Sequence, residues 1–175
     1  MSSRPRKNEE PVEKKIVRIL KAGGLTVATA ESCTGGLVAG TLVNADGISA
    51  VYKEGFITYS NEAKQKYLGV KKETLDTYGA VSRETASEMA QGAALAADAD
   101  AAIVTTGIAG PDGGTEEKPV GLVYIGCWLK GKTVVKRCFF GGDRQNIRYM
   151  AVKEALDILY CQLLSDGMEF PVGDF

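Results

Sequence analysis

The chain has 175 residues, of which 45% are apolar and 25% are charged, and its formal net charge is −1. These values predict one soluble domain that buries its own core, and no apolar run approaches the roughly 20 residues needed to span a bilayer. A membrane protein is therefore not expected, and neither is a general nucleic-acid binder, which would carry a basic excess.

Helical and strand patterns alternate along the chain. In chain order, the expected elements are a helix from Pro11 to the stop at Gly23-Gly24, a strand over 25–30, a helix over 37–43, a strand over 51–59, helices over 61–68 and 83–97, a strand over 101–106, a hairpin of strands over 120–129 and 133–140, and a last helix ending near Leu164. Ser82 and Asp143 are the expected N-caps of two of these helices. The order predicts an α/β sandwich with a mixed sheet, formed by a single domain over 11–165 between a flexible N-terminal tail (1–10) and a C-terminal tail (166–175).

Two features of the composition restrict the chemistry. The sequence contains no histidine, which excludes a Ser-His-Asp triad, a Cys-His dyad and a histidine-based zinc site. A hydrolytic base must then be Lys, Tyr, Asp, Glu or a metal. The four cysteines, at positions 33, 127, 138 and 161, form no C-x-x-C pair. They predict free thiols in a reducing compartment, the cytoplasm.

The turn over 31–36 is the first candidate site, because it joins a buried strand to a helix. Ser32 stands there as a nucleophile would, and free N–H groups at the start of the helix suit an oxyanion. Gly35 and Gly36 let a substrate approach the backbone closely. In the alternative interpretation, Ser32 or Thr34 only caps the helix and the glycines only make the turn.

The segment 59–64 offers a base for this chemistry. Lys64 is the leading candidate, since burial lowers the pKa of a lysine and makes its neutral amine available. Ser60 and Lys64 are four positions apart, so they are also able to pair locally on a helix. The alternative is a solvated lysine in a first helical turn.

Two further segments are candidates for binding a ligand. The loop over 105–114 is rich in Gly and Ala and follows a buried strand, so it is expected to share one crevice with the Ser32 turn. In the segment 141–148, Arg144 and Arg148 lie four apart at the start of a helix, an arrangement that suits a phosphate. The alternatives are an ordinary surface loop and two surface arginines.

One motif is misleading. Residues 126–133 match the phosphate-loop pattern G-x-x-x-x-G-K-T, but bulky residues fill the loop and β-branched residues follow it in place of a helix. We interpret this segment as a hairpin turn. The aromatic residues Trp128, Phe139 and Phe140 are expected in the core of that hairpin rather than stacked on a ligand.

Taken together, these segments resemble the CinA C-terminal domain family, the nicotinamide-nucleotide amidases. The matching segments stand in the family's order and cover about residues 12 to 164: Thr29–Gly36, Tyr59–Lys64, Gly79–Ser82, Thr106–Pro111, Glu117–Gly121 and Gly142–Arg144. Larger members of the family carry an additional N-terminal domain, and this chain resembles the stand-alone form. The resemblance implies a three-layer α/β/α domain, assembly into a homo-oligomer, no metal and no dissociable cofactor.

The resemblance also implies a reaction, the hydrolysis of nicotinamide mononucleotide to nicotinate mononucleotide and ammonia in pyridine nucleotide recycling. Ser32 corresponds to the family's nucleophile, Lys64 to its base, Tyr59 and Thr106 to residues beside the site, and Arg144, with Arg148 as its neighbour, to the phosphate-side arginine. We expect the N–H groups of the Cys33–Gly36 turn, those of Cys33 and Thr34 above all, to bind the oxyanion. Thr34, Gly35, Gly36, Gly107 and Gly110 are expected to contact the substrate.

Two alternatives remain open from the sequence. One is a non-catalytic pyridine-nucleotide-binding module, although binding alone needs neither Ser32 nor Lys64. The other is a competence or DNA-repair accessory protein, which the net charge of −1 does not support.

Overall fold

A computed structural model describes residues 10–166 of the chain, so the two expected tails fall almost entirely outside the described residues. One five-stranded sheet forms its middle layer, with the strands in the order β2-β1-β3-β4-β5. The strands are β1 (Val27–Glu31), β2 (Tyr52–Ile57), β3 (Ala101–Gly107), β4 (Leu122–Leu129) and β5 (Lys132–Phe139). Strand β1 pairs in parallel with β2 and β3, whereas β4 is antiparallel to β3 and β5. The sheet is mixed, as the sequence predicts.

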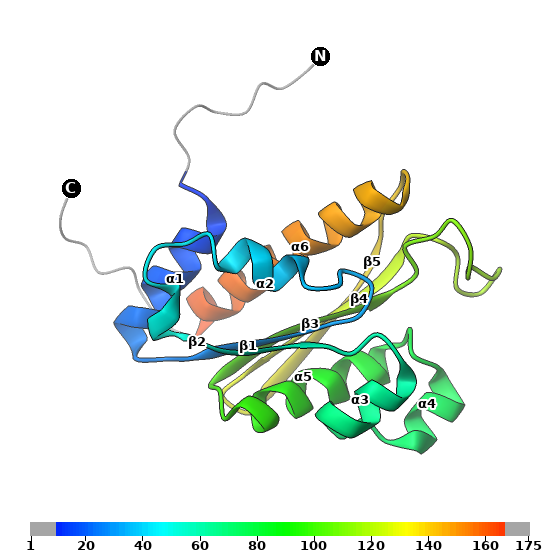
Figure 1. Ribbon diagram of the computed structural model, residues 1–175, viewed down its shortest axis with the longest axis horizontal. Coiled ribbons are helices and arrows are strands. Elements are labelled where there is room, and N and C mark those ends of the chain that lie inside the picture. Colours follow the sequence, from blue (N-terminus) through cyan, green and yellow to red (C-terminus); the bar gives the residue numbers. More distant parts are fainter. Residues whose placement is uncertain (1–9, 167–175) are drawn as a thin grey trace, which may run out of the picture.

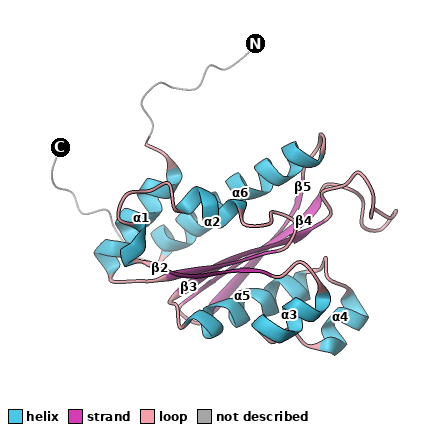
Figure 2. Cartoon of the chain, in the orientation of Figure 1, coloured by secondary structure: helices cyan, strands magenta, loops and turns pink. Residues whose placement is uncertain are grey.

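Helices cover both faces of this sheet, which gives the expected three-layer α/β/α sandwich (Figure 1). The helices are α1 (Val12–Gly23), α2 (Leu37–Leu42), α3 (Asn61–Leu68), α4 (Lys72–Tyr78), α5 (Arg83–Ala97) and α6 (Arg144–Ser165), and a short 3-10 helix, η1, spans Ile48–Ala50. Helices α1, α2 and α6 lie on one face of the sheet, and α3, α4 and α5 lie on the other (Figure 2). Within residues 10–166 no helix has the length and apolar character that crossing a membrane requires.

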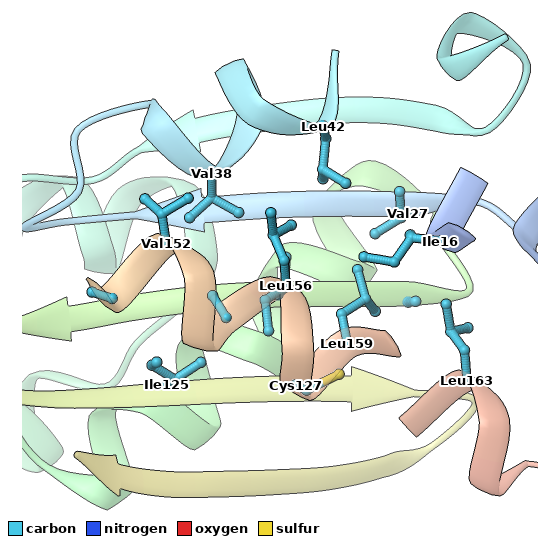
Figure 3. Packing of buried hydrophobic residues seen from close by; sticks show 14 of the residues in the cluster. Ile16, Val27, Val38, Leu42, Ile125, Cys127, Val152, Leu156, Leu159 and Leu163 are labelled. Atoms are coloured by element: carbon cyan, nitrogen blue, oxygen red, sulfur yellow. The ribbon is translucent and has the colours of Figure 1, made fainter. Parts of the chain in front are cut away.

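The larger part of the core lies between the sheet and the layer of α1 and α6. Side chains of α6, among them Val152, Leu156 and Leu159, pack toward the strands, where they meet Ile125 and other buried residues (Figure 3). Each of these side chains is at least 94% buried, so α6 is fixed along most of its length. This matters for the site, because α6 begins with Arg144.

On the other face, small residues bring α5 and α3 close together. A Cβ atom added to Gly92 of α5 would lie 1.8 Å from the carbonyl oxygen of Leu68, the last residue of α3. Any residue larger than glycine would therefore push the two helices apart. Since α3 carries Lys64, the close contact between α3 and α5 bears on the position of that lysine.

Strands β1 and β3 are joined at their beginning by a polar clamp as well as by their ladder. The Asp100 carboxylate accepts hydrogen bonds from the N–H and the hydroxyl of Thr26, both at 2.9 Å, across 74 positions of sequence. Beyond the clamp the two strands run in register to Glu31 and Thr105. The opposite ends of both strands therefore meet at one edge of the sheet.

The observed elements follow the predicted ones closely, with α4 and η1 as the exceptions. Helix α4 buries only Thr74 and Leu75, and no side chain caps its start, so it leaves no clear pattern in the sequence. A distant residue holds it instead: the Glu88 carboxylate accepts hydrogen bonds from the Lys71 N–H and the Thr74 hydroxyl.

The capping and hairpin predictions are confirmed. The side chains of Ser82 and Asp143 accept N–H groups at the starts of α5 and α6. The segment that imitates a phosphate loop is the β4–β5 hairpin, whose turn places Lys130 and Gly131 at positive φ. Phe139 is 55% exposed, so its placement in the hairpin core was wrong, whereas Trp128 and Phe140 pack against buried clusters.

Candidate active site

The site lies at the sheet edge where β1 and β3 end. Ser32 directly follows β1, and its N–H donates to the Thr105 carbonyl oxygen of β3 at 3.0 Å. The two glycine-containing loops after these strands therefore share one crevice, a cavity of about 260 Å³. It is lined by Ser32, Cys33, Tyr59, Lys64, Ala80, Val81, Thr106, Gly107, Ile108, Ala109, Gly110, Asp112, Gly113 and Arg144.

Lys64 and Ser32 meet at the bottom of this cavity. The Lys64 Nζ donates to the Ser32 Oγ at 3.2 Å and to the Thr58 carbonyl oxygen at 2.8 Å. Lys64 is 1% exposed, so it is not the solvated lysine of the alternative interpretation. The local pair with Ser60 does not form, because the Ser60 hydroxyl accepts the Ala63 N–H and serves as the N-cap of α3.

Burial controls the charge of this lysine. Loss of solvation lowers the pKa of Lys64 to about 8, against a smaller opposing effect of the Cys33 thiol. No carboxylate in residues 10–166 forms an ion pair with it to hold the proton. Roughly a tenth of the molecules then carry the neutral amine at pH 7, and half do at pH 8. A neutral amine beside a hydroxyl is able to take its proton.

The Glu31 carboxylate holds the turn after Ser32 in place. Glu31 is 1% exposed and accepts hydrogen bonds from the Thr34 hydroxyl at 2.6 Å and from the N–H groups of Gly36, Val38 and Ala39 at 3.0, 3.0 and 2.8 Å. The start of α2 is therefore neutralised from within the protein. This corrects the expectation that the start of the helix is free to receive an oxyanion.

The N–H groups that remain for an oxyanion are fewer than the sequence suggested. The Gly35 N–H donates to the Ser32 carbonyl oxygen at 3.1 Å, and the Gly36 N–H belongs to Glu31. Among residues 10–166, no acceptor binds the N–H groups of Cys33 and Thr34. Of these two residues, Cys33 lines the cavity whereas Thr34 is 0% exposed and does not, so the Cys33 N–H is the donor left for a ligand beside Ser32.

Three of the expected substrate contacts do not line the cavity. The Thr34 hydroxyl is fully buried between Glu31 and the Thr105 hydroxyl, 2.7 Å away. Gly35 and Gly36 have φ angles of 61° and 98°, so they form the turn and present no surface to the cavity. Gly107 and Gly110 do line the cavity.

The two arginines of α6 point to different places. Arg144 lines the cavity, where it donates to the Gly110 carbonyl oxygen at 2.7 Å and to the Tyr59 hydroxyl at 3.1 Å. Arg148 instead donates to the Cys33 and Thr34 carbonyl oxygens and borders a second, larger cavity. Of the two, only Arg144 is positioned to reach a ligand beside Ser32.

The remaining predicted residues lie at the walls of the cavity. The Thr106 hydroxyl donates to the Ala80 carbonyl oxygen at 2.7 Å and has no hydrogen bond to Lys64, so it does not orient that lysine directly. Tyr59 is 62% exposed at the rim. Burial raises the pKa of the Cys33 thiol to about 11, so this neighbour of Ser32 stays protonated and is a poor nucleophile.

Sequence reasoning missed two residues that matter here. Glu31 was quoted only as part of a motif, although an acidic residue just before a helix is the available signal for its role. The Thr58 carbonyl, which accepts from Lys64, leaves no signal because any residue would provide it. Within residues 10–166, no group of three His, Cys, Asp or Glu residues is arranged to hold a metal ion.

Comparisons with known proteins agree on one family. A model described as the CinA C-terminal domain matches residues 9–163. A CinA-like protein of Kosmotoga olearia is 58% identical over 156 residues, which cover 89% of this chain and 38% of that protein. The chain thus spans about two fifths of the length of curated relatives such as this one.

Solved structures show the same fold over chains of similar length. The competence/damage inducible protein CihA from Agrobacterium tumefaciens superposes with a TM-score of 0.81 at 44% identity, covering 91% of this chain and 99% of that one. A CinA superfamily protein from Enterobacter cloacae gives a TM-score of 0.85 at 37% identity, covering 93% and 98%. The three-layer fold with its mixed sheet is therefore shared by both.

Proposed function

Because this chain belongs to the CinA C-terminal domain family, we propose that it is an amidohydrolase that converts nicotinamide mononucleotide and water to nicotinate mononucleotide and ammonia. One observation carries the proposal: a buried lysine, with its pKa lowered to about 8, lies 3.2 Å from a serine hydroxyl at the bottom of a cavity. A lysine kept out of water without a carboxylate is costly for the fold, and binding alone gives it no use. This favours catalysis over a non-catalytic binding module.

In the first step, neutral Lys64 takes the hydroxyl proton of Ser32, and the Ser32 Oγ attacks the carboxamide carbon of the nicotinamide ring. The resulting ammonium of Lys64 then returns that proton to the amide nitrogen. The carbon–nitrogen bond breaks, ammonia leaves, and an ester joins the nicotinoyl group to Ser32. The pair lies within the distance that such a proton transfer needs.

The oxyanion formed during this attack needs donors close to the nucleophile. The N–H group of Cys33, the first after Ser32, is the donor proposed for it. The Thr58 carbonyl accepts a hydrogen bond from Lys64 at 2.8 Å and so helps to hold the Nζ beside Ser32.

The second step removes the acyl group. A water molecule attacks the ester carbon while neutral Lys64 accepts one of its protons. The carbon–Oγ bond breaks, and Lys64 returns the proton to Ser32, which releases nicotinate mononucleotide and restores the enzyme. The reaction consumes one water, and no oxidant or cofactor is needed to balance it.

Arg144 is the proposed ligand of the 5′-phosphate. Its guanidinium has five N–H donors, and within residues 10–166 this side chain forms two hydrogen bonds, to Gly110 and Tyr59. The other donors are available at the cavity to a phosphate, for which Arg has a suitable planar geometry. A phosphate contact would make the nucleotide a better substrate than free nicotinamide.

The experiment is ammonia release from purified protein supplied with nicotinamide mononucleotide. Ser32→Ala and an EDTA-treated sample are run in parallel. Release that survives EDTA and disappears in the variant supports a metal-free serine amidase. Ser32→Ala with near-normal turnover refutes the assignment of the nucleophile, and a folded wild type that binds the nucleotide without releasing ammonia favours the binding module.

A further inference from the structure

Arg148 makes an unusual pair of contacts with the turn that carries the proposed nucleophile. From α6, its Nε donates to the Cys33 carbonyl oxygen at 3.0 Å and its Nη2 donates to the Thr34 carbonyl oxygen at 2.9 Å. One guanidinium thus spans two consecutive peptide groups, across more than 110 positions of sequence. The planar fork of arginine suits this geometry, whereas the single ammonium of lysine does not.

The first contact fixes the peptide group between Cys33 and Thr34. The Cys33 carbonyl and the Thr34 N–H belong to this planar trans group, so they point in opposite directions. When Arg148 binds the carbonyl, the orientation of the whole group is set. Thr34 is 0% exposed and does not line the cavity of Ser32, so this contact stabilises the turn and does not present the Thr34 N–H to a ligand.

The second contact reaches the proposed donor, the Cys33 N–H, through one more step. The Thr34 carbonyl shares its peptide group with the Gly35 N–H, which donates back to the Ser32 carbonyl oxygen at 3.1 Å. The Ser32 carbonyl in turn shares its peptide group with the Cys33 N–H. Fixing the Thr34 carbonyl therefore fixes the Cys33 N–H as well.

Charge adds to this geometric effect. A guanidinium bound to a carbonyl oxygen polarises the peptide group and strengthens its N–H as a donor. Glu31 accepts the N–H groups of Gly36, Val38 and Ala39, farther along the turn, and in the described part of the chain no acceptor binds the Cys33 N–H. Arg148 binds the Cys33 and Thr34 carbonyl oxygens of the same turn.

We propose that Arg148 is a positioning residue, which holds the peptide groups of the turn after Ser32 so that the Cys33 N–H serves as an oxyanion donor. The proposal rests on the proposed function of Ser32 as a nucleophile. It replaces the expectation that Arg148 binds phosphate, because Arg148 borders the second cavity with Leu37 and Tyr149 and does not line the cavity of Ser32.

The test compares Arg148→Met and Arg148→Lys with Lys153→Met, a control that removes an exposed cation from the same helix. Two rates are measured for each: the kcat and KM of ammonia release from nicotinamide mononucleotide, and the phosphonylation of Ser32 by a fluorophosphonate. Phosphonylation builds negative charge on an oxygen beside the Cys33 N–H, but it needs neither an amide nor a 5′-phosphate. Thermal unfolding shows whether each variant is folded.

We expect Arg148→Met to lower kcat and the phosphonylation rate by about 10- to 100-fold, because oxyanion donors contribute at this level or above, and to change KM by less than about threefold. Arg148→Lys should recover only part of the loss, and Lys153→Met should match the wild type. The pH midpoint of kcat/KM should stay where Lys64 sets it, since the base is not disturbed.

The proposal is overturned if folded Arg148→Met keeps both rates within about twofold of the wild type, or if the loss lies in KM alone, as a phosphate ligand would give. If Arg148→Met does not fold, the ratio for Arg148→Lys decides in the same way. A wild type that releases no ammonia but is phosphonylated at Ser32 refutes the proposed substrate, and the phosphonylation ratio still decides the role of Arg148.

Discussion

Replacing Glu31 by Gln tests how strongly the turn after Ser32 depends on one buried carboxylate. Its Oε2 accepts three hydrogen bonds and its Oε1 accepts one, from the Ala39 N–H at 2.8 Å. Glutamine retains a single acceptor oxygen, so at best it keeps the three bonds and directs its own N–H₂ group toward the Ala39 N–H. One charge-assisted bond is then lost, and two donors face each other in a site that is 1% exposed.

The lost bond is worth about 1.5–3 kcal/mol, and the negative charge at the start of the helix adds about 0.3–1 kcal/mol. We therefore expect Glu31→Gln to lower the free energy of unfolding by about 2–4 kcal/mol, a large part of the total of a typical domain. Urea denaturation followed by circular dichroism measures it, as a lower midpoint with an unchanged slope.

A matched control is available on α5. Glu88 is only half-buried and accepts two hydrogen bonds, from the Lys71 N–H at 2.8 Å and the Thr74 hydroxyl at 2.7 Å. Glu88→Gln should cost about 0.5–1.5 kcal/mol. If Glu31→Gln destabilises the protein no more than Glu88→Gln does, the carboxylate does not hold the turn and the reasoning is wrong.

Four other perturbations have defined outcomes. Since the proposed mechanism needs neutral Lys64, whose pKa burial lowers to about 8, kcat/KM should rise with pH to about 8 and level off above it; a profile flat from pH 6 to 9 contradicts this. Gly92→Ala should destabilise the protein by about 2 kcal/mol or more, because its Cβ meets the Leu68 carbonyl oxygen at 1.8 Å, and should lower kcat by shifting α3. In Gly40→Ala the added Cβ meets nothing within 4 Å, so this substitution should raise the free energy of unfolding by about 0.5–1 kcal/mol, measured by urea denaturation. Arg144→Met should raise KM at least about tenfold more for the nucleotide than for the dephosphorylated riboside, and equal effects on both would exclude a phosphate contact.

Local sequence patterns predicted most of the fold because most elements carry their own signals. Helix α5 begins at a capping serine, and α3 ends at Gly69 with positive φ, so both boundaries follow from residues adjacent to them. Helix α4 was missed because its stability comes from Glu88, 14 positions beyond Thr74. A sequence pattern cannot express such a tertiary contact.

The site divides in the same way. The absence of histidine and the two motifs pointed to Ser32 and Lys64, and the structure brings these side chains to 3.2 Å. Spacing alone left Arg144 and Arg148 equivalent, since both lie on one helix face at its start. Their different partners, Gly110 for the first and Cys33 for the second, come from loops that only the packed sheet brings near α6.

The clamp between Thr26 and Asp100 bears on how an active molecule is produced. Parallel pairing of β1 with β3 requires residues 74 positions apart to meet, and closing a loop of that length is slow compared with forming helices. During synthesis, Ser32 leaves the ribosome long before β3, whose Thr105 carbonyl accepts its N–H. Helical content should therefore return early in refolding from urea, whereas amidase activity should return only with the slowest phase that completes the sheet.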